Sequence, residues 1–279
     1  MNLKGKTVII TGGSEGVGAA TARAFASEGA NLLLVARRKK KLEIIADELR
    51  TKTRVEIFTA DVADADACAS LFKKAQFDFG SVHVLINNAG YHKRGPVMTV
   101  DTDDLAAMID VNLKAPIVLS RLAIPYILES GGGAIINVGS LAGRTAVPGA
   151  ASYCASKAGL RAFTFALAEE LRGKGIKLAT VSPGPIDTGF IMSNLDAVAD
   201  LTFSQPISTA DEVAAEILKL CSNAKRERSM PPISGFLTTL MYLFPWLGRT
   251  ARPIFEEKGR RVKRRLKAEM HQRSRESVD

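Results

Sequence analysis

Apolar and polar positions follow two different periodicities along the chain. Six short segments are nearly continuous runs of β-branched residues and leucine, at 6–12, 31–37, 54–62, 82–90, 133–140 and 176–184. Such runs are typical of strands that are buried on both faces of a sheet. Longer stretches with helical spacing lie between them, at 17–29, 39–51, 64–79, 102–130 and 152–173. This alternation predicts an α/β fold in which a doubly wound parallel sheet is flanked by helices.

Most of the expected strands end in Gly, Asn, Asp or Ser. Ligands of open parallel sheets bind beyond the carboxyl ends of the strands, so these polar or flexible residues mark the expected binding edge. The alternating pattern stops near residue 225. We therefore expect a sheet domain over residues 1–225 and a C-terminal extension over residues 226–279.

A glycine-rich loop follows the first expected strand and leads into a helix. Gly12, Gly16 and Gly18 are spaced G-x-x-x-G-x-G. Glycines allow a tight turn and a close approach of the backbone to a pyrophosphate, and the helix N-terminus offers unpaired N–H groups. The loop could also be an ordinary turn, but the strand before it and the helix after it favour a dinucleotide site.

The end of the second expected strand distinguishes NADP from NAD. NAD sites commonly place a carboxylate there for the ribose 2′-hydroxyl, whereas NADP sites place a cation for the 2′-phosphate. Here the strand leads into Arg37, Arg38 and Lys39 to Lys41, with no carboxylate at its end. A solvated start of the next helix accounts for some of these charges. Glu15 in the glycine loop is unusual for an NADP site, but the sequence favours NADP(H) with Arg37 at the phosphate.

Tyr153 and Lys157 are four residues apart in an expected helix, with only small residues between them. Side chains at this spacing share one face. They could form a solvated surface pair. Alternatively, the ammonium could lower the pKa of the phenol, which is about 10 when unperturbed, and so prepare it for proton transfer.

Several motifs together resemble the short-chain dehydrogenase/reductase family. They are "TGGSEGVG" (11–18), "DV" (61–62), "NNAG" (87–90), Asn112 in "DVNLKAP", Ser140 in "INVGS", "YCASK" (153–157) and "SPGPIDT" (182–188). They occur in the order and at the spacing of that family over about residues 1–225. The resemblance implies a Rossmann-like seven-stranded sheet and a homodimer or homotetramer.

The resemblance also implies the site residues. The catalytic set would be Asn112, Ser140, Tyr153 and Lys157. The expected cofactor-binding residues are Gly12, Ser14, Gly16, Val17, Gly18, Arg37, Asp61, Val62, Asn88, Ala89, Gly90, Tyr153, Lys157, Pro183, Gly184, Ile186 and Thr188. Ser140 would hold the carbonyl oxygen near Tyr153, and Asn112 would anchor a water or, alternatively, repair a helix irregularity. His92, Tyr91, Leu141, Arg144 and Val147 lie where substrate could pass, although loop structure explains them equally well. We expect no metal site.

The extension carries most of the basic charge. Residues 225–279 hold fourteen Lys and Arg against six Asp and Glu, a balance of +8 out of the +9 of the whole chain. The apolar stretch 230–248 is interrupted by prolines, and its uninterrupted apolar core, Gly235 to Phe244, is too short to span a bilayer. It precedes a helix over 251–270 with Phe255, Val262, Leu266 and Met270 on one face. This pattern predicts contact with an anionic membrane surface through 230–270, with packing on the sheet domain or on another subunit as the alternative and nucleic acid disfavoured.

The expected activity is the NADP(H)-dependent reduction of a ketone to a secondary alcohol, with Tyr153 as the acid. If the extension touches lipid, the substrate would be apolar or lipid-like, because family members that reduce 3-ketosphinganine resemble this layout in their apolar C-terminal extension. The family keeps a substrate lid at 189–208, where an apolar pocket and plain packing explain the apolar residues equally well: Phe190, Ile191, Met192, Leu195 and Leu201. The alternatives are an alcohol or sugar dehydrogenase that works in oxidation, and a membrane-recruited nucleotide-sensing scaffold. Three scattered cysteines and no recognisable signal peptide indicate a cytoplasmic protein, peripheral to a membrane if the extension binds lipid.

Overall fold

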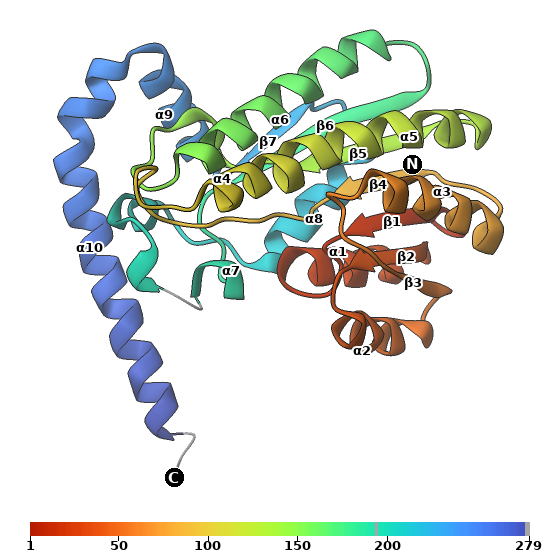
Figure 1. The fold of residues 1–279 in the computed structure, drawn as a ribbon, viewed down its shortest axis with the longest axis horizontal. Coiled ribbons are helices and arrows are strands. Elements are labelled where there is room, and N and C mark those ends of the chain that lie inside the picture. The colour runs from red at the N-terminus through yellow and green to blue at the C-terminus, as the bar shows by residue number, and fades with distance from the viewer. Residues whose placement is uncertain (193–194, 277–279) are drawn as a thin grey trace.

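A single seven-stranded parallel sheet forms the centre of the protein (Figure 1). The computed structural model describes residues 1–192 and 195–276, with side chains through Met270. The strand order is β3-β2-β1-β4-β5-β6-β7, so the order reverses between β1 and β4. The strands are β1 (Thr7–Thr11), β2 (Asn31–Ala36), β3 (Val55–Thr59), β4 (Val84–Asn87), β5 (Gly133–Val138), β6 (Ile176–Pro183) and β7 (Glu227–Met230). The expected doubly wound, Rossmann-like fold is confirmed.

Helices cover both faces of the sheet. One face packs against α1 (Gly16–Ser27), α2 (Lys39–Arg50) and α8 (Ala210–Leu220), and the other against α3 (Ala65–Phe79), α5 (Ala115–Glu129) and α6 (Ala151–Glu170). Successive strand residues alternate between the two cores: Val8 and Ile10 belong to the first and Ile9 to the second. This explains why the strands read as continuous apolar runs.

The helix expected over 102–130 contains an irregular turn. It consists of α4 (Thr102–Ile109), a π-helical turn η1 (Asp110–Lys114) and α5. Its span 102–129 is apolar and long enough to cross a bilayer. It packs on the sheet as a core helix, however, and core helices of soluble proteins can have the same length and apolar composition.

The sheet extends beyond the boundary that we expected at residue 225. Strand β7, "ERSM", pairs with β6 along Thr180–Pro183. Its sequence has no β-branched residue and no apolar alternation, so periodicity did not reveal it as a strand. The sheet domain therefore includes residues 227–230, and a boundary at 225 would remove its edge strand.

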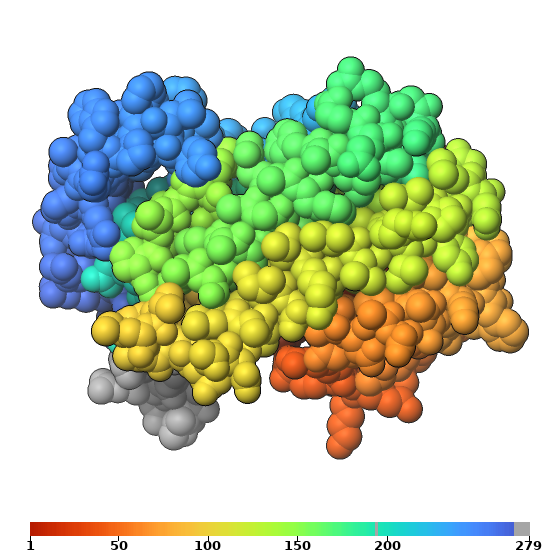
Figure 2. Space-filling model, turned by 45° about the horizontal axis from the view of Figure 1, so that its top comes forward, coloured from red at the N-terminus to blue at the C-terminus, as the bar shows by residue number. Residues whose placement is uncertain are grey.

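The extension forms two helices at one end of the molecule. They are α9 (Pro232–Leu243) and the 32-residue α10 (Pro245–Glu276). In Figure 1, α10 stands at the end opposite α2 and α3, and Figure 2 shows a hollow between the extension and the neighbouring surface. The expected helix over 251–270 thus lies inside a longer one.

The apolar face of α10 packs on the segment that we expected to form the lid. This segment contains α7 (Gly189–Met192) and the 3₁₀ turns η3 (Leu195–Ala197) and η4 (Asp200–Ser204). Val262 and Leu266 contact a small buried cluster of Ile191, Leu195, Val198 and Phe203. At Gly259 the backbones are so close that a Cβ would lie 1.8 Å from the carbonyl oxygen of Asp200. Part of the amphipathic face is therefore occupied within the chain.

Candidate active site

One continuous cavity of about 1570 Å³ lies along the carboxyl ends of the strands. All of the expected cofactor residues except Gly18 line it, as do Ser140, Tyr153 and Lys157. Gly18 and Asn112 lie behind its wall. The five residues that we placed near a passing substrate, Tyr91, His92, Leu141, Arg144 and Val147, also line the cavity.

The glycine loop is held tightly against the start of the next segment. A Cβ at Gly18 would lie 2.0 Å from the carbonyl oxygen of Gly12 and 2.6 Å from Nδ2 of Asn88. Asn88 Nδ2 donates to the carbonyl of Thr11 at 2.8 Å, and the Thr11 hydroxyl accepts from the backbone N–H of Asn88 and of Ala89, both at 3.0 Å. Asn88 therefore shapes the loop.

Cations surround the end of β2. Arg37 lies 3.7 Å from Asp61 and is largely exposed. Arg38 and Lys41 both pair with Glu15 at 2.5 Å, and the hydrogen bond from Lys41 is the largest of the effects that hold the pKa of Glu15 below its usual range. Glu15 thus gathers two cations at the rim of the cavity, beside Arg37. A 2′-phosphate of NADP(H) fits this cluster, and the backbone cradle at Gly12 and Gly18 fits a pyrophosphate.

Tyr153 and Lys157 face the same side of α6, as their spacing predicts. Lys157 Nζ lies 5.8 Å from the centroid of the Tyr153 ring and donates a hydrogen bond to the carbonyl of Val138 at 2.8 Å. Ser140, directly after β5, hydrogen-bonds with the Tyr153 hydroxyl. The three expected reactive side chains therefore come together at the carboxyl ends of β5 and β6.

Burial moves the pKa values of this pair in opposite directions. It raises the pKa of Tyr153 to about 12, although the hydrogen bond with Ser140 and the charge of Arg94 act the other way. It lowers the pKa of Lys157 to about 8. We expected Lys157 to lower the pKa of Tyr153, and that expectation was wrong for this state, because desolvation of the phenolate outweighs the hydrogen bond with Ser140 and the charge of Arg94. Tyr153 is consequently protonated at neutral pH.

Asn112 is fully buried in the π-helical turn η1. Its Oδ1 accepts from the backbone N–H of Tyr91 at 2.8 Å, while Nδ2 donates to the carbonyl of Tyr91 at 2.8 Å and to the Ser156 hydroxyl at 3.2 Å. These bonds tie the loop after β4 to the helix that carries Tyr153. Any role in proton relay remains a prediction.

Aromatic rings enclose Tyr153. The His92 ring stacks on it with centroids 4.1 Å apart, and the Phe190 ring is tilted over it at 6.3 Å. Burial lowers the pKa of His92 to about 3, so this ring is neutral. Arg94 covers Phe190 with its guanidinium 5.5 Å from the ring centroid and donates to the Phe190 carbonyl at 2.9 Å. The sequence interpretation missed Arg94, because no local pattern separates it from the other loop residues.

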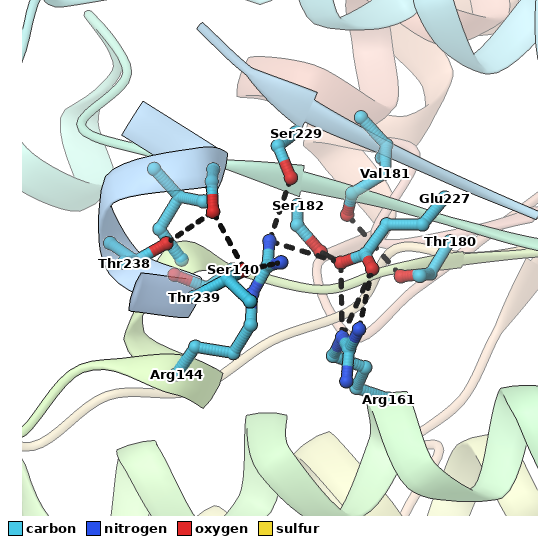
Figure 3. Close-up of polar contacts among 12 residues, drawn as sticks. Ser140, Arg144, Arg161, Thr180, Val181, Ser182, Glu227, Ser229, Thr238 and Thr239 are labelled. Atoms are coloured by element: carbon cyan, nitrogen blue, oxygen red, sulfur yellow. Dashed lines mark hydrogen bonds and ion pairs between the residues drawn. The ribbon is translucent and has the colours of Figure 1, made fainter. Parts of the chain in front are cut away.

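A buried ion-pair network joins the catalytic segment to the extension (Figure 3). Arg144 follows Ser140 by one 3₁₀ turn and lies 3.2 Å from Glu227 of β7, which also binds Arg161 at 2.9 Å. Arg144 further donates to the hydroxyls of Ser229 at 2.7 Å and Thr239 of α9 at 2.9 Å. Of the polar residues of β7, Glu227 and Ser229 thus take part in this network, while Arg228 pairs with Glu216 at 3.0 Å.

The extension also supplies one wall of the cavity, which the sequence interpretation did not foresee. The lining residues from it are Leu237, Thr238, Met241 and Tyr242 of α9 and Pro245, Gly248, Arg249, Arg252 and Phe255 of α10. The α10 residues recur at helical spacing, so one stripe of the helix faces the cavity. Of the lid residues that we expected around an apolar pocket, Phe190, Ile191 and Leu201 line the cavity. Leu195 is buried in the small cluster beneath α10, and Met192 packs against that cluster instead of lining the cavity.

Comparisons with known proteins agree with this geometry. The profile of the short chain dehydrogenase family matches residues 6–198. The chain belongs to the short-chain dehydrogenase family. It is 36% identical over 216 residues to sulfoacetaldehyde reductase 2 of Chromohalobacter salexigens, covering 76% of this chain and 86% of that protein. It is 35% identical over 246 residues to the ketoacyl reductase HetN of Nostoc sp., covering 86% and 84%.

A solved family member shows the same fold with a cofactor. The short chain dehydrogenase of Burkholderia cenocepacia, in complex with NADP, has a TM-score of 0.74 and 30% identity, covering 82% of this chain and 97% of that one. The short-chain dehydrogenase described here is accordingly an oxidoreductase of the C=O/CH–OH type that uses NADP(H). The family profile ends at residue 198, so it does not describe the wall that α9 and α10 provide.

Proposed function

We propose that the protein reduces a ketone with an apolar body to a secondary alcohol, with NADPH as the hydride donor and Tyr153 as the proton donor. The observation that supports this most is the protonated phenol of Tyr153, which hydrogen-bonds with Ser140 beside Lys157, in the same cavity as the cofactor residues. Two relatives, a sulfoacetaldehyde reductase and a ketoacyl reductase, bear names of reductive reactions.

Each side chain has a separate task in this reaction. The Ser140 hydroxyl holds the carbonyl oxygen next to Tyr153. When bound, the reduced nicotinamide supplies a hydride to the carbonyl carbon. The oxygen becomes more basic as the hydride arrives, and Tyr153 gives it a proton. The ammonium of Lys157 stabilises the phenolate that remains, and its low pKa lets it pass a proton on.

Reduction of a carbonyl needs a protonated phenol at Tyr153. Oxidation of an alcohol needs a phenolate as base, and a pKa of about 12 opposes that form near neutral pH. In the ligand-free protein Tyr153 is therefore in the form from which reduction starts, and for this reason we propose reduction rather than the alcohol or sugar dehydrogenase alternative. A nucleotide-sensing scaffold would not need Ser140, Tyr153 and Lys157 together.

The test is NADPH oxidation with a panel of carbonyl compounds: linear 2-ketones of increasing length, cyclic ketones and sugars. Activity that rises with chain length, with NADPH preferred over NADH, would support the proposal. The Tyr153→Phe variant serves as the inactive control. Turnover confined to polar sugars, or none with any carbonyl, would refute it.

We further propose that the extension rests on the anionic inner face of a membrane in an otherwise cytoplasmic protein. Large apolar side chains are more than half exposed around the α9–α10 junction: Ile233, Phe236, Tyr242, Leu243, Trp246 and Ile254. Arginines and lysines of α10 surround them, and such charges bind anionic lipid with about 1 kcal/mol each. Removal of the chain after residue 224 would not test this contact, because it would also remove β7 from the sheet.

Flotation with liposomes that contain phosphatidylserine tests the membrane contact in the full chain. Binding should be lost in a Phe236→Ser/Leu243→Ser/Trp246→Ser variant and kept in an Ile44→Ser control, whose exposed apolar residue lies on α2. Equal flotation of both variants would contradict the proposed membrane contact. A homodimer or homotetramer also remains a prediction, which analytical ultracentrifugation can check.

A further inference from the structure

The part of the cavity around Tyr153 carries positive charge without carboxylates. Among the described residues, no Asp or Glu lines the cavity within 140–150, 189–205 or 237–255, which are the catalytic segment, the lid and the extension. The lining carboxylates are Glu15 and Asp61, at the cofactor end, and Asp110, which pairs with Lys114 at 2.6 Å. The charged side chains that line these three ranges are therefore all cations.

Four arginines line this part, and two of them are neutralised. Arg144 pairs with Glu227, and Arg252 pairs with Glu256 at 2.6 Å. Arg94 and Arg249 have no carboxylate partner in the part of the chain that the structure describes. A guanidinium has five N–H donors, and Arg94 uses one described bond, from Nη2 to the Phe190 carbonyl.

Arg94 differs from Arg249 in its position. It stacks on Phe190, which covers Tyr153, and it is near enough to Tyr153 for its charge to act on the phenol. Burial also lowers the pKa of Arg94, whereas Arg249 lies exposed at the rim. A partly buried cation without a counterion is costly unless a ligand provides one.

We propose that Arg94 binds an acidic group of the substrate, which makes the substrate an oxo acid with an apolar remainder. The acidic group, a carboxylate, sulfonate or phosphate, lies a few bonds from the carbonyl carbon, because Arg94 and Tyr153 both lie against Phe190 and the charge of Arg94 acts on the phenol. The planar guanidinium suits a two-oxygen contact with such a group. The apolar remainder points to Leu141, Val147 and the wall that Leu237 and Met241 provide. This assignment rests on the proposed function and narrows its substrate class.

The test compares matched acids and esters. The probes are 2-, 3- and 4-oxodecanoate, each with its methyl ester, assayed with NADPH for wild type, Arg94→Gln and Arg94→Lys. Decyl-chain oxo sulfonate and oxo phosphate analogues show which acidic group is preferred. Lys93→Gln is the matched control, because Lys93 is the adjacent cation but pairs with Asp104 and does not line the cavity.

For at least one position of the oxo group, wild type should prefer the acid over its ester in kcat/KM. Arg94→Gln should lower that preference by about 10- to 100-fold, the value of a charged hydrogen-bonded contact. Arg94→Lys should restore part of it, and Lys93→Gln should not change it. The preference is the decisive readout, since loss of the bond to Phe190 slows both substrates alike. An unchanged preference in Arg94→Gln, or a loss in Arg249→Gln instead, would overturn the assignment.

Calorimetry on the NADP⁺-saturated enzyme separates this idea from the proposed function. If no carbonyl is turned over, the reductase proposal fails, but acid binding can still be measured. Tighter binding of the acid than of the ester in wild type, lost in Arg94→Gln, would support the assignment. Equal binding of the two would refute it.

Discussion

The two ends of the cavity are built in different ways. The cofactor end consists of short loops that directly follow β1 to β4, and neighbouring backbone groups hold their shape, as between Gly12, Gly18 and Asn88. The substrate end is assembled from the catalytic segment, the lid and the extension, which are far apart in sequence and are joined by packing and by ion pairs such as Arg144–Glu227. Local motifs therefore determine the first end, and long-range contacts determine the second.

The largest expected effect comes from cutting the link between these segments. Glu227→Gln leaves the buried Arg144 and the partly exposed Arg161 without their counterion, and breaking the buried Arg144–Glu227 pair costs about 3–5 kcal/mol. The thermal midpoint should fall strongly in calorimetry. Glu257→Gln is the control, because Glu257 also binds two arginines but is exposed, and its loss should leave the thermal midpoint nearly unchanged. Equal losses would show that the network does not hold the substrate end together.

The same substitution at the two ends should have unequal effects on cofactor binding. Gly18→Ala puts a Cβ against the Gly12 carbonyl, so the loop must move, and NADPH affinity should fall by about 100-fold. Gly189→Ala in the lid meets nothing within 4 Å. Its NADPH affinity, measured by fluorescence titration, should equal that of wild type. Weakening of both variants alike would mean that the two ends are not independent.

Cofactor selection should depend on the cation at the end of β2. Arg37→Asp should reduce the preference for NADPH over NADH by about 30-fold, since a charged contact with phosphate is worth about 2 kcal/mol. Arg54→Asp, on the segment before β3 and outside the cavity, provides the control. If Arg37→Asp keeps the preference for NADPH over NADH, then Arg38 and Lys41 bind the 2′-phosphate in place of Arg37, after their ion pairs with Glu15 break.

A smaller effect is expected from pH. Lys157 has a pKa of about 8 and assists as an ammonium, so kcat/KM for reduction should fall as pH rises through 8, by about tenfold between pH 7 and 9. Tyr153, with a pKa of about 12, stays protonated over this range and adds no second decline. Lys157→Arg should remove the decline near pH 8, although with a lower rate. A flat profile for wild type up to pH 10 would show that the charge of Lys157 does not matter.

This difference between local motifs and long-range contacts explains which parts of the fold and of the site could be predicted from the sequence. The strands β1 to β6, the glycine loop and the Tyr153–Lys157 pair depend on local periodicity or spacing, and the structure has them at the expected positions. Strand β7 escaped notice because its polar residues form ion pairs and hydrogen bonds, Glu227 and Ser229 with Arg144 and Arg228 with Glu216, rather than packing in an apolar core. The roles of Arg94 and of the cavity-facing stripe of α10 could not be predicted, because they depend on the lid and the extension lying beside α6. The high pKa of Tyr153 likewise depends on burial by His92 and Phe190, which no motif encodes.

The central claim is that Tyr153 delivers the proton to the reduced carbonyl. The most direct measurement compares wild type with Tyr153→Phe for kcat with a turned-over ketone at pH 7, together with NADPH affinity by fluorescence. We predict a loss in kcat of about 10²–10⁴-fold, the usual contribution of a positioned acid, with NADPH affinity within a factor of about three of wild type. Equal kcat values for the two proteins would contradict the account.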